Sequence, residues 1–255
     1  MQIAGQNVLI TGAGRGLGAA LAEELARRGA RVVLVARTPA PLEEVAGRIR
    51  RAGGEAHVFP ADVGSKRAIH PIAGAAAALV GDIDILVHCA STLGPTPLPP
   101  LLDLDCEALE ETLAVNLVGP FRLTKALAGS MVLRGSGLVV AISSDAAVEA
   151  YPRWGAYGVS KAGLDHLMRI FAAELEGTGV RFLAIDPGEM DTRMHAEAMP
   201  DADRTTLARP ADVARRIADI IARAEARPNG ARLKAGAEAE TAAAGAPAAA
   251  AEVAP

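Results

Sequence analysis

A glycine-rich stretch near the N-terminus constrains the fold of this chain more than any other feature of the sequence. It follows a short apolar run at residues 8–10 and precedes a helical pattern in which apolar side chains recur every three or four residues. A strand, a glycine loop and a helix in this order make an anion site, because glycines let backbone amides approach a pyrophosphate and the helix N-terminus adds favourable partial charge. We therefore predict a dinucleotide site at Thr11, Gly12, Gly14, Arg15, Gly16, Leu17 and Gly18.

Further apolar runs alternate with helical patterns along the rest of the chain. Strands that are nearly continuously apolar and alternate with helices are typical of a parallel sheet covered on both faces. We predict the α/β class, with a doubly wound parallel sheet in a single domain over residues 1–234 and ligands beyond the carboxyl ends of the strands. The predicted strands lie at residues 8–10, 31–36, 56–59, 83–89, 137–142 and 180–185.

The end of the second predicted strand tests which dinucleotide binds. An acidic residue there would hydrogen-bond the adenosine ribose 2′-hydroxyl, whereas an arginine suits a 2′-phosphate. The chain has Arg37 at this point, and Arg15 in the glycine loop could close on the same phosphate. One charge-assisted contact contributes about 1.5–3 kcal/mol, enough to bias selection about tenfold or more. We predict NADP(H) in preference to NAD(H); the alternative is that both arginines are solvated surface charges.

Asp62 and Val63 follow the third predicted strand and complete the proposed cofactor site. The Asp62 carboxylate could accept a hydrogen bond from the adenine amino group. Alternatively, it could cap the helix that begins near Ser65.

Tyr157 and Lys161 are the leading candidates for chemistry in the second half of the chain. Four residues apart on a helix, they lie on one face, one turn from each other. A free phenol titrates at about 10, and an ammonium about 5 Å away favours its phenolate by roughly 3 kcal/mol, or about two pKa units. Such a pair is tuned to exchange protons, although the same spacing also occurs on ordinary helix surfaces.

Two further polar positions precede this pair. Pro120 lies inside a helical pattern over residues 106–133 and removes the amide that would bond to the carbonyl of Asn116, so we expect the helix to loosen there. An asparagine beside such a defect can hold a water, or it is simply tolerated at a kink. Ser143 and Ser144 end the fifth predicted strand and so reach the carboxyl edge of the sheet.

Taken in order, these motifs resemble those of the short-chain dehydrogenase/reductase family, in its single-domain branch of about this length. The order and the spacing match together over residues 6–221, including the thirteen residues from Ser144 to Tyr157. The motifs are Thr11-Gly-x-x-x-Gly16-x-Gly18, Asn116, Ser144, Tyr157-x-x-x-Lys161 and Pro187-Gly188-x-x-x-Thr192.

The resemblance implies a Rossmann fold and an NAD(P)-dependent oxidoreductase that interconverts a carbonyl and a secondary alcohol. Tyr157 would be the general acid and base, with Lys161 lowering its pKa and binding the nicotinamide ribose. Ser144 would hydrogen-bond the substrate oxygen, and Asn116 would hold a relay water. The cofactor would also be lined by Ala90, Pro187, Gly188 and Thr192.

An alternative from another class is a catalytically silent NADP(H)-binding sensor or regulatory protein of the same fold. A sensor has no need of the complete set of Asn116, Ser144, Tyr157 and Lys161, which favours the enzyme.

The substrate, a small carbonyl or alcohol compound, is expected to meet three segments, at residues 93–100, 145–154 and 189–207. The last of these carries several methionines, whose flexible side chains suit an adaptable apolar pocket. We expect it to act as a mobile lid, and the alternative is an ordinary loop packed on its own domain.

Two departures from the family pattern lie at the fourth strand and at the end of the chain. The family usually has Asn-Asn-Ala-Gly where this chain has His88-Cys89-Ala90-Ser91, and we interpret His88 as structural. The seventh strand of the family has at best a poor remnant at residues 229–234. Residues 235–255 are mostly alanine, so we predict a disordered tail. We expect a homodimer through residues 106–133 and 155–175, whereas a tetramer is doubtful.

Charge and composition exclude several classes of function. The net charge is −4 and the pI about 5.8, without a basic block, which argues against a nucleic-acid surface. The two cysteines are too few for a disulfide framework, and neither Cys-x-x-Cys nor a histidine cluster suggests a metal site. Because no signal peptide or long apolar segment is visible, we expect a cytoplasmic protein that does not cross a membrane.

Overall fold

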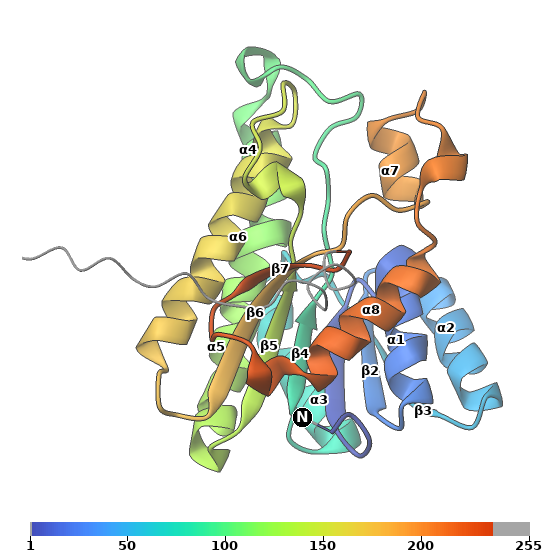
Figure 1. Cartoon of the computed structure of the whole chain (residues 1–255), viewed down its shortest axis with the longest axis vertical. Coiled ribbons are helices and arrows are strands. Elements are labelled where there is room, and N and C mark those ends of the chain that lie inside the picture. Colours follow the sequence, from blue (N-terminus) through green and yellow to red (C-terminus); the bar gives the residue numbers. More distant parts are fainter. Residues whose placement is uncertain (1, 237–255) are drawn as a thin grey trace, which may run out of the picture.

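Seven strands form one parallel sheet in the computed structural model of the protein, which describes residues 2–236 (Figure 1). Their spatial order is β3-β2-β1-β4-β5-β6-β7, so the chain builds outward from β1 and then crosses to the other side at β4. All six strand pairs are parallel, and their carboxyl ends therefore share one edge of the sheet. The predicted doubly wound α/β fold is confirmed. The strands are Asn7–Thr11 (β1), Arg31–Ala36 (β2), Glu55–Pro60 (β3), Ile85–His88 (β4), Gly137–Ile142 (β5), Val180–Asp186 (β6) and Arg232–Lys234 (β7).

Helices cover both faces of this sheet. One face carries α1 (Gly16–Arg27), α2 (Pro39–Arg51) and α8 (Pro210–Ala222), and the other carries α3 (Ile69–Val80), α5 (Gly119–Arg134) and α6 (Gly155–Glu174). Figure 1 shows α4 (Cys106–Leu113) and α7 (Arg193–Ala198) beyond the carboxyl edge, where the predicted ligands would lie. Short 3-10 turns are Lys66–Ala68 (η1), Leu101–Asp103 (η2), Asp145–Ala147 (η4), Arg204–Thr206 (η5) and Ala224–Ala226 (η6).

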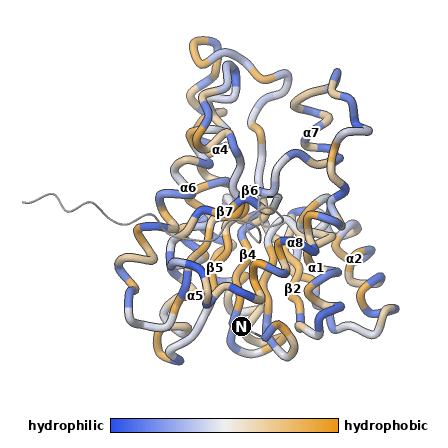
Figure 2. Tube along the Cα trace, viewed as in Figure 1, coloured by the Kyte–Doolittle hydropathy of each residue, from blue (hydrophilic) through white to orange (hydrophobic). Residues whose placement is uncertain are grey.

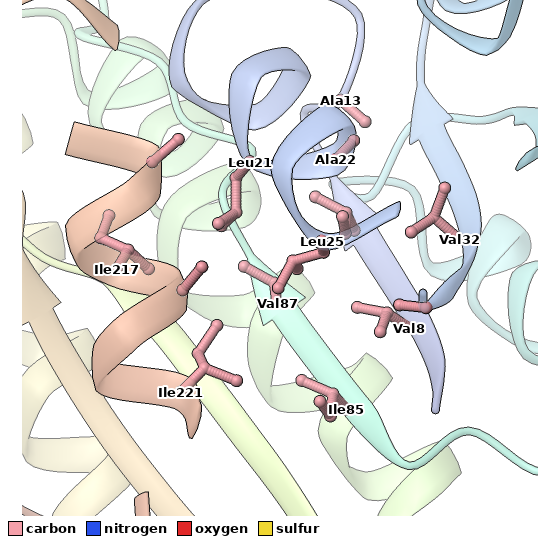
Figure 3. Packing of buried hydrophobic residues seen from close by; sticks show 14 of the residues in the cluster. Val8, Ala13, Leu21, Ala22, Leu25, Val32, Ile85, Val87, Ile217 and Ile221 are labelled. Carbon is pink, nitrogen blue, oxygen red and sulfur yellow. The ribbon is translucent and has the colours of Figure 1, made fainter. Parts of the chain in front are cut away.

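Alternation along the strands divides the core into two layers. Val8 and Ile10 face α1 and α8, whereas Leu9 between them belongs to the layer on the opposite face. The strands are largely orange, that is hydrophobic, in Figure 2, as expected for strands buried on both sides. This core holds the carboxyl edge of the sheet rigid. Figure 3 shows the first layer, in which α1 and α8 meet over β1, β2 and β4 through side chains that include Leu21, Leu25, Ile217 and Ile221.

The helix expected over residues 106–133 is interrupted by a π-helical turn. α4 ends at Leu113, Ala114–Val118 form the π-helix η3, and α5 begins at Gly119. Pro120 lies at the start of α5, where the missing N–H of a proline is tolerated. The predicted loosening beside Asn116 is confirmed, and π turns of this kind often accompany functional sites.

The end of the chain differs from the sequence-based interpretation. Residues 229–234 were expected to hold a poor remnant of a strand, but β7 is present as a short edge strand that pairs with β6. Its three residues pair in parallel with Ala184, Ile185 and Asp186. Residues 237–255 of the predicted disordered tail lie outside the described residues. No helix within residues 2–236 is both long enough and apolar enough to cross a membrane.

Candidate active site

The side chains with expected catalytic roles gather where β5 meets α6. Ser144 follows β5, and Tyr157 and Lys161 lie in the first turns of α6. Tyr157 and Lys161 are only 8% and 2% exposed, and Lys161 Nζ lies 5.5 Å from the centroid of the Tyr157 ring. The same Nζ donates a 2.7 Å hydrogen bond to the carbonyl of Ile142. The pair is therefore buried at the carboxyl edge of the sheet, and it is not an ordinary pair on a helix surface.

Burial dominates the electrostatics of this pair. It lowers the pKa of Lys161 to about 8, although the negative charge of Asp165 opposes the shift. It raises the pKa of Tyr157 to about 12, although the Ser144 hydroxyl acts in the other direction. The expectation that Lys161 would bring the pKa of Tyr157 below its ordinary value is therefore wrong, because desolvation of the phenolate is the largest influence and raises the pKa. Tyr157 is held as a neutral phenol, which can donate a proton.

The two serines after β5 have different partners. Ser143 Oγ is buried and donates to Asp165 Oδ2 at 2.8 Å. Ser144 Oγ donates to Asp145 Oδ1 at 2.9 Å and accepts from the amide of Ala146 at 3.2 Å. Because the Ser144 hydroxyl also lowers the pKa of Tyr157, Ser144 is the serine positioned beside the phenol.

Asn116 on the π-helix has no exposed surface, and protein groups use all of its side-chain hydrogen bonding. Its Nδ2 donates to the Thr92 carbonyl at 2.8 Å and to Ser160 Oγ at 2.9 Å. Its Oδ1 accepts from the Thr92 amide at 2.8 Å and from Ser91 Oγ at 3.2 Å. The amide thus braces the loop after β4 against α6. A relay water at this position would have to use the backbone of the π turn, since an amide has only two N–H donors and one oxygen.

The glycine loop is compact because its glycines lie against neighbouring backbone. A Cβ on Gly12, whose φ is +69°, would lie 2.7 Å from the backbone of Ala90, and a Cβ on Gly18 would lie 2.3 Å from the carbonyl oxygen of Gly12. Gly16, with φ +55°, opens α1 beside Thr192. The glycines thus avoid side chains that would fill the loop, and the loop lies at the N-terminus of a twelve-residue helix, so these residues fit a dinucleotide.

The remaining residues of the loop have different environments. The side chain of Leu17 is buried in the core, so its backbone is the part available to a ligand. A Cβ on Gly14 would only reach ordinary contact, 3.7 Å from the Cβ of Ala36, which shows that the loop adjoins the end of β2. Arg15 and Arg37 are both exposed at this junction, and neither forms an ion pair within residues 2–236. Both guanidinium groups are therefore free to meet an anion.

Polar residues at the edge of the cofactor site also stabilise the protein's own turns. Thr11 Oγ1 accepts hydrogen bonds of 3.1 Å from the amides of both Cys89 and Ala90, so it ties β1 to the segment after β4. Asp62 Oδ1 accepts from the amide two residues further on at 2.9 Å, which closes a turn before η1 and does not cap a helix. Val63 is buried in the core.

The segment that departs from the family pattern is well connected. His88 Nε2 lies 2.8 Å from Thr124 Oγ1, and burial together with the charge of Lys161 lowers the pKa of His88 to about 3, so the ring is neutral and structural. Burial raises the pKa of the Cys89 thiol to about 11. No group of three or more His, Cys, Asp and Glu side chains in the described part of the chain could hold a metal ion.

The loop after β6 brings further expected residues to the cradle. Gly188, with φ +72°, donates its amide to Asp186 Oδ1 at 3.0 Å, and Pro187 lies between these two residues. Thr192 Oγ1 accepts from the amide of His195 at 3.2 Å and so caps α7. A Cβ on Gly16 would lie 3.6 Å from the methyl group of Thr192, which shows that this loop lies beside the glycine loop.

The three segments expected around the substrate meet in a cleft of about 450 Å³. The ring of Trp154, which lines the cleft, lies edge-on to Tyr157 at 5.7 Å between centroids. Arg153 also lines it and has a left-handed backbone, with φ 72°. The cleft therefore leads toward the buried phenol. Its lining residues are Thr96, Pro97, Leu98, Pro152, Arg153, Trp154, Glu197, Ala198 and Pro200.

Sequence reasoning missed Arg232, which reaches this site from β7. Its guanidinium bonds to Asp165, Asp186 and the carbonyl of Ser144. Asp165 gave one available signal, because an acidic residue one turn after Lys161 on the packed side of a helix needs a partner when buried. The sequence offered no means to tell which cation that partner is.

Comparisons with known proteins agree with this geometry. The family model described as short chain dehydrogenase matches residues 6–203. The 2,3-dihydro-2,3-dihydroxybenzoate dehydrogenase of Bacillus subtilis is 35% identical over 192 residues, which are 75% of this chain and 72% of that protein. A short chain dehydrogenase of Pseudocercospora fijiensis is 35% identical over 197 residues, or 76% of this chain. The match spans 63% of that fungal protein, less than two-thirds of its length.

Solved structures show the same fold. A metagenomic short-chain oxidoreductase in complex with NADP superposes with a TM-score of 0.78 at 31% identity, covering 92% of this chain and 98% of that one. A 7α-hydroxysteroid dehydrogenase complexed with NADH and 7-oxo glycochenodeoxycholic acid superposes with a TM-score of 0.83 at 26% identity, covering 91% and 93%. With a family match over most of its length and a sheet of the same kind, this chain belongs to the short-chain dehydrogenase family of oxidoreductases.

Proposed function

We propose that the protein is an NADP(H)-dependent carbonyl reductase in which Tyr157 donates the proton. The observation that carries the proposal is the burial of Tyr157 beside Lys161 and Ser144, with the ring of Trp154 between the phenol and an open cleft. A buried phenol that meets both a cation and a hydroxyl at the carboxyl edge of the sheet is equipped for proton transfer.

The roles of the side chains follow from where charge develops. A bound nicotinamide supplies or accepts the hydride, and a carbonyl that accepts hydride develops negative charge on its oxygen. The hydroxyls of Ser144 and Tyr157 stabilise that charge, and Tyr157 then transfers its proton to the oxygen. With a pKa of about 12, Tyr157 is protonated at neutral pH, so the resting phenol carries the proton that the substrate oxygen takes up. Lys161, with a pKa of about 8, remains largely cationic there and stabilises the phenolate that is left.

The cofactor preference rests on two exposed arginines. Arg15 and Arg37 flank the junction between the glycine loop and β2, where we expect the adenosine ribose to lie. The amides of the cradle at Gly12 and Gly16 would hold the pyrophosphate, and residues 187–192 would hold the nicotinamide. One structural relative carries NADP and another carries NADH, so our choice of NADP(H) for this chain depends on its own arginines.

We also propose that the protein forms a homodimer in a reducing compartment such as the cytoplasm. α6 and the segment of η3 and α5 beside it form an apolar groove of about 320 Å³. Phe121 and Ile170 in this groove are 41% and 42% exposed, and such a surface favours burial against a second copy. Cys89 and Cys106 are unpaired, which suits reducing conditions.

A carbonyl panel assayed with NADPH at the nicotinamide absorbance tests the proposed function. We expect turnover by the wild type and a loss of about 10²–10⁴-fold in Tyr157→Phe. Tyr151→Phe is a comparison variant with a much smaller expected loss, because Tyr151 is the other tyrosine of the chain and its hydroxyl, 3.0 Å from Asp145 Oδ2, reaches Ser144 only through that carboxylate. Tight NADPH binding without turnover of any carbonyl would favour a cofactor sensor and would contradict the reductase.

A further inference from the structure

β7 delivers an arginine to the back of the active site from beyond the family match. The family model ends at residue 203, whereas Arg232 opens the short strand that pairs with β6. Arg232 is opposite Ala184, two residues before Asp186 at the carboxyl end of β6. Its side chain is 21% exposed, so most of it lies inside the protein, behind the end of β5. This position is set by the end of the chain and not by the family motifs.

One guanidinium group joins three elements of the site. Arg232 Nε donates to Asp165 Oδ2 on α6 at 2.9 Å. Its Nη2 donates to the carbonyl of Ser144 after β5 at 2.7 Å and to Asp186 Oδ2 at the end of β6 at 3.1 Å. The planar fork of a guanidinium can meet several acceptors in fixed directions, which a lysine ammonium cannot do equally well.

Each of the three acceptors leads to a group with a proposed role. The carbonyl belongs to Ser144 itself. Asp165 accepts from the neighbouring Ser143 hydroxyl, and its charge acts on Lys161. Asp186 holds the amide of Gly188 at the start of the loop expected to meet the nicotinamide. A displacement of the guanidinium would therefore shift the substrate hydroxyl, the buried ammonium and the cofactor loop relative to one another.

Two buried acids in this cluster share one arginine. The side chains of Asp165 and Asp186 are 7% and 4% exposed, so both carboxylates need cationic partners inside the protein. Arg232 forms an ion pair with both of them, and Lys161 adds a favourable charge at Asp165. Without Arg232, both buried acids would lose their ion-pair partner, and the unpaired charge of Asp165 would act more strongly on Lys161.

We propose that Arg232 is a positioning residue for hydride transfer, which aligns Ser144 and the 187–192 loop while it neutralises the carboxylates behind them. The inference rests on the reductase activity proposed above. It assigns to the C-terminal strand a role in catalysis as well as in closing the edge of the sheet.

The test compares the full-length wild type with Arg232→Ala and Arg232→Lys, each assayed at the same interval below its own melting temperature. Arg181→Ala is a matched control, because Arg181 also ties β6 to the C-terminal segment, through the carbonyl of Arg227, but at the end of β6 remote from Ser144. The measurements are kcat, the dissociation constant of NADPH, and the primary isotope effect on kcat with NADPH deuterated at the transferred position.

For Arg232→Ala we expect kcat to fall about 10- to 100-fold, as a misplacement of about 1 Å can do. The isotope effect should rise, because a misaligned hydride step becomes rate-limiting, while NADPH affinity changes little. Added guanidinium ion should restore part of kcat. Arg232→Lys keeps the charge among the acids and provides the same readout if the alanine variant folds poorly. We expect an intermediate kcat and a raised isotope effect.

Several results would overturn the inference. If kcat in Arg232→Ala and Arg232→Lys equalled that of the wild type and of Arg181→Ala, then the bonds of Arg232 would only stabilise the fold, and the reductase proposal would still stand. A fall in kcat with an unchanged isotope effect would show that hydride transfer is not the step affected. A wild type that binds NADPH and reduces no carbonyl would refute the proposed function, and the role of Arg232 with it.

Discussion

The two halves of the sheet build their parts of the site from different materials. On the side of β1 to β3, the cofactor cradle is made of glycines and backbone amides, and the buried polar side chains among the described residues there are Asn7, Thr11 and Glu24. From β4 onward, the described residues include nine such side chains, and several of them are linked by hydrogen bonds or charge to the elements that carry Ser144, Tyr157 and Lys161. They are His88, Thr112, Asn116, Thr124, Ser143, Ser160, Lys161, Asp165 and Asp186.

This difference predicts different responses to substitution. A site made of backbone is limited by space, so an added atom there disturbs the fold and the ligand together. A site made of buried polar side chains is limited by desolvation, so removing a group can abolish function and leave stability unchanged or higher. The cradle and the pocket around Tyr157 should thus tolerate different substitutions, although both serve one proposed reaction. The cradle would bind the dinucleotide, and the pocket would meet the carbonyl.

The largest expected effect is in the second half, at Lys161. Lys161→Met should lower kcat/KM by about 10²–10⁴-fold, because the cation beside the proton donor is lost. At pH 7 the variant should nevertheless be as stable as the wild type or more stable by up to about 2 kcal/mol. This follows because the lowered pKa of Lys161 corresponds to a penalty of about 3 kcal/mol, of which the lost bond to Ile142 offsets about 1.

The difference in stability between the wild type and Lys161→Met should depend on pH, and the lowered pKa of Lys161 fixes the direction of that dependence. The pKa of Lys161 is lowered from 10.5 to about 8, so between these values the unfolded chain holds a proton that the folded protein does not. The wild type should therefore gain stability relative to Lys161→Met as the pH rises from about 8 to 10.5. Urea unfolding at a series of pH values measures this difference. A variant that is much less stable than the wild type at pH 7 would mean that the ammonium supports the fold.

A smaller effect is expected in the cradle, where a substitution should lower the stability of the protein instead of preserving it. Gly12→Ala places a Cβ 2.7 Å from the backbone of Ala90 at a position with φ +69°. We expect a loss of about 2–4 kcal/mol in the free energy of unfolding, together with weaker NADPH binding. Gly14→Ala is the matched control, because its Cβ would have only ordinary contacts of 3.4 Å or more, and it should change stability by less than about 0.5 kcal/mol.

Chemical denaturation and NADPH titration of both glycine variants test the contrast. If Gly12→Ala kept its stability and lost only the cofactor, then the cradle would be limited by its ligand contacts in the same way as the pocket around Tyr157. The comparison between the two halves would then fail.

How far the sequence could predict the molecule follows the same division. Six of the seven strands, the glycine loop and the interruption beside Pro120 were predictable because periodicity and steric limits act over a few residues, whereas β7 was expected only as a poor remnant. The direction of the pKa shift of Tyr157 was not, because it depends on how many atoms exclude water from the phenol. The partners of Asn116 and Arg232 were not predictable either, since polar contacts between residues far apart in the chain leave no periodic pattern.

Arg37→Ala tests whether side chains contribute to the cradle as well as backbone. Loss of a charge-assisted contact should raise KM for NADPH by about tenfold and leave KM for NADH nearly unchanged. Arg51→Ala is the control, because Arg51 is also exposed and lies at the end of α2. An unchanged preference in Arg37→Ala would show that the cofactor is selected by other groups. In that case the side chain of Arg37 would contribute nothing to selection, as expected if the strands β1 to β3 bind the cofactor chiefly through backbone groups.

The smallest expected effect is at Arg153, where the second half contains a position limited by backbone geometry. Its φ of 72° is left-handed, which costs a residue with a side chain about 1–2 kcal/mol. Arg153→Gly removes that strain but adds freedom to the unfolded chain that costs about 0.5–1 kcal/mol, so we expect a net gain in stability of up to about 1 kcal/mol.

Arg153→Ala keeps the strain and removes the same side chain, so the difference between the two variants in urea unfolding isolates the contribution of the backbone. A glycine variant less stable than the alanine variant would contradict the strain. The protein retains this strain in the wall of the proposed substrate cleft, next to Trp154, so relief by glycine should change kcat/KM for bulky carbonyls more than for small ones.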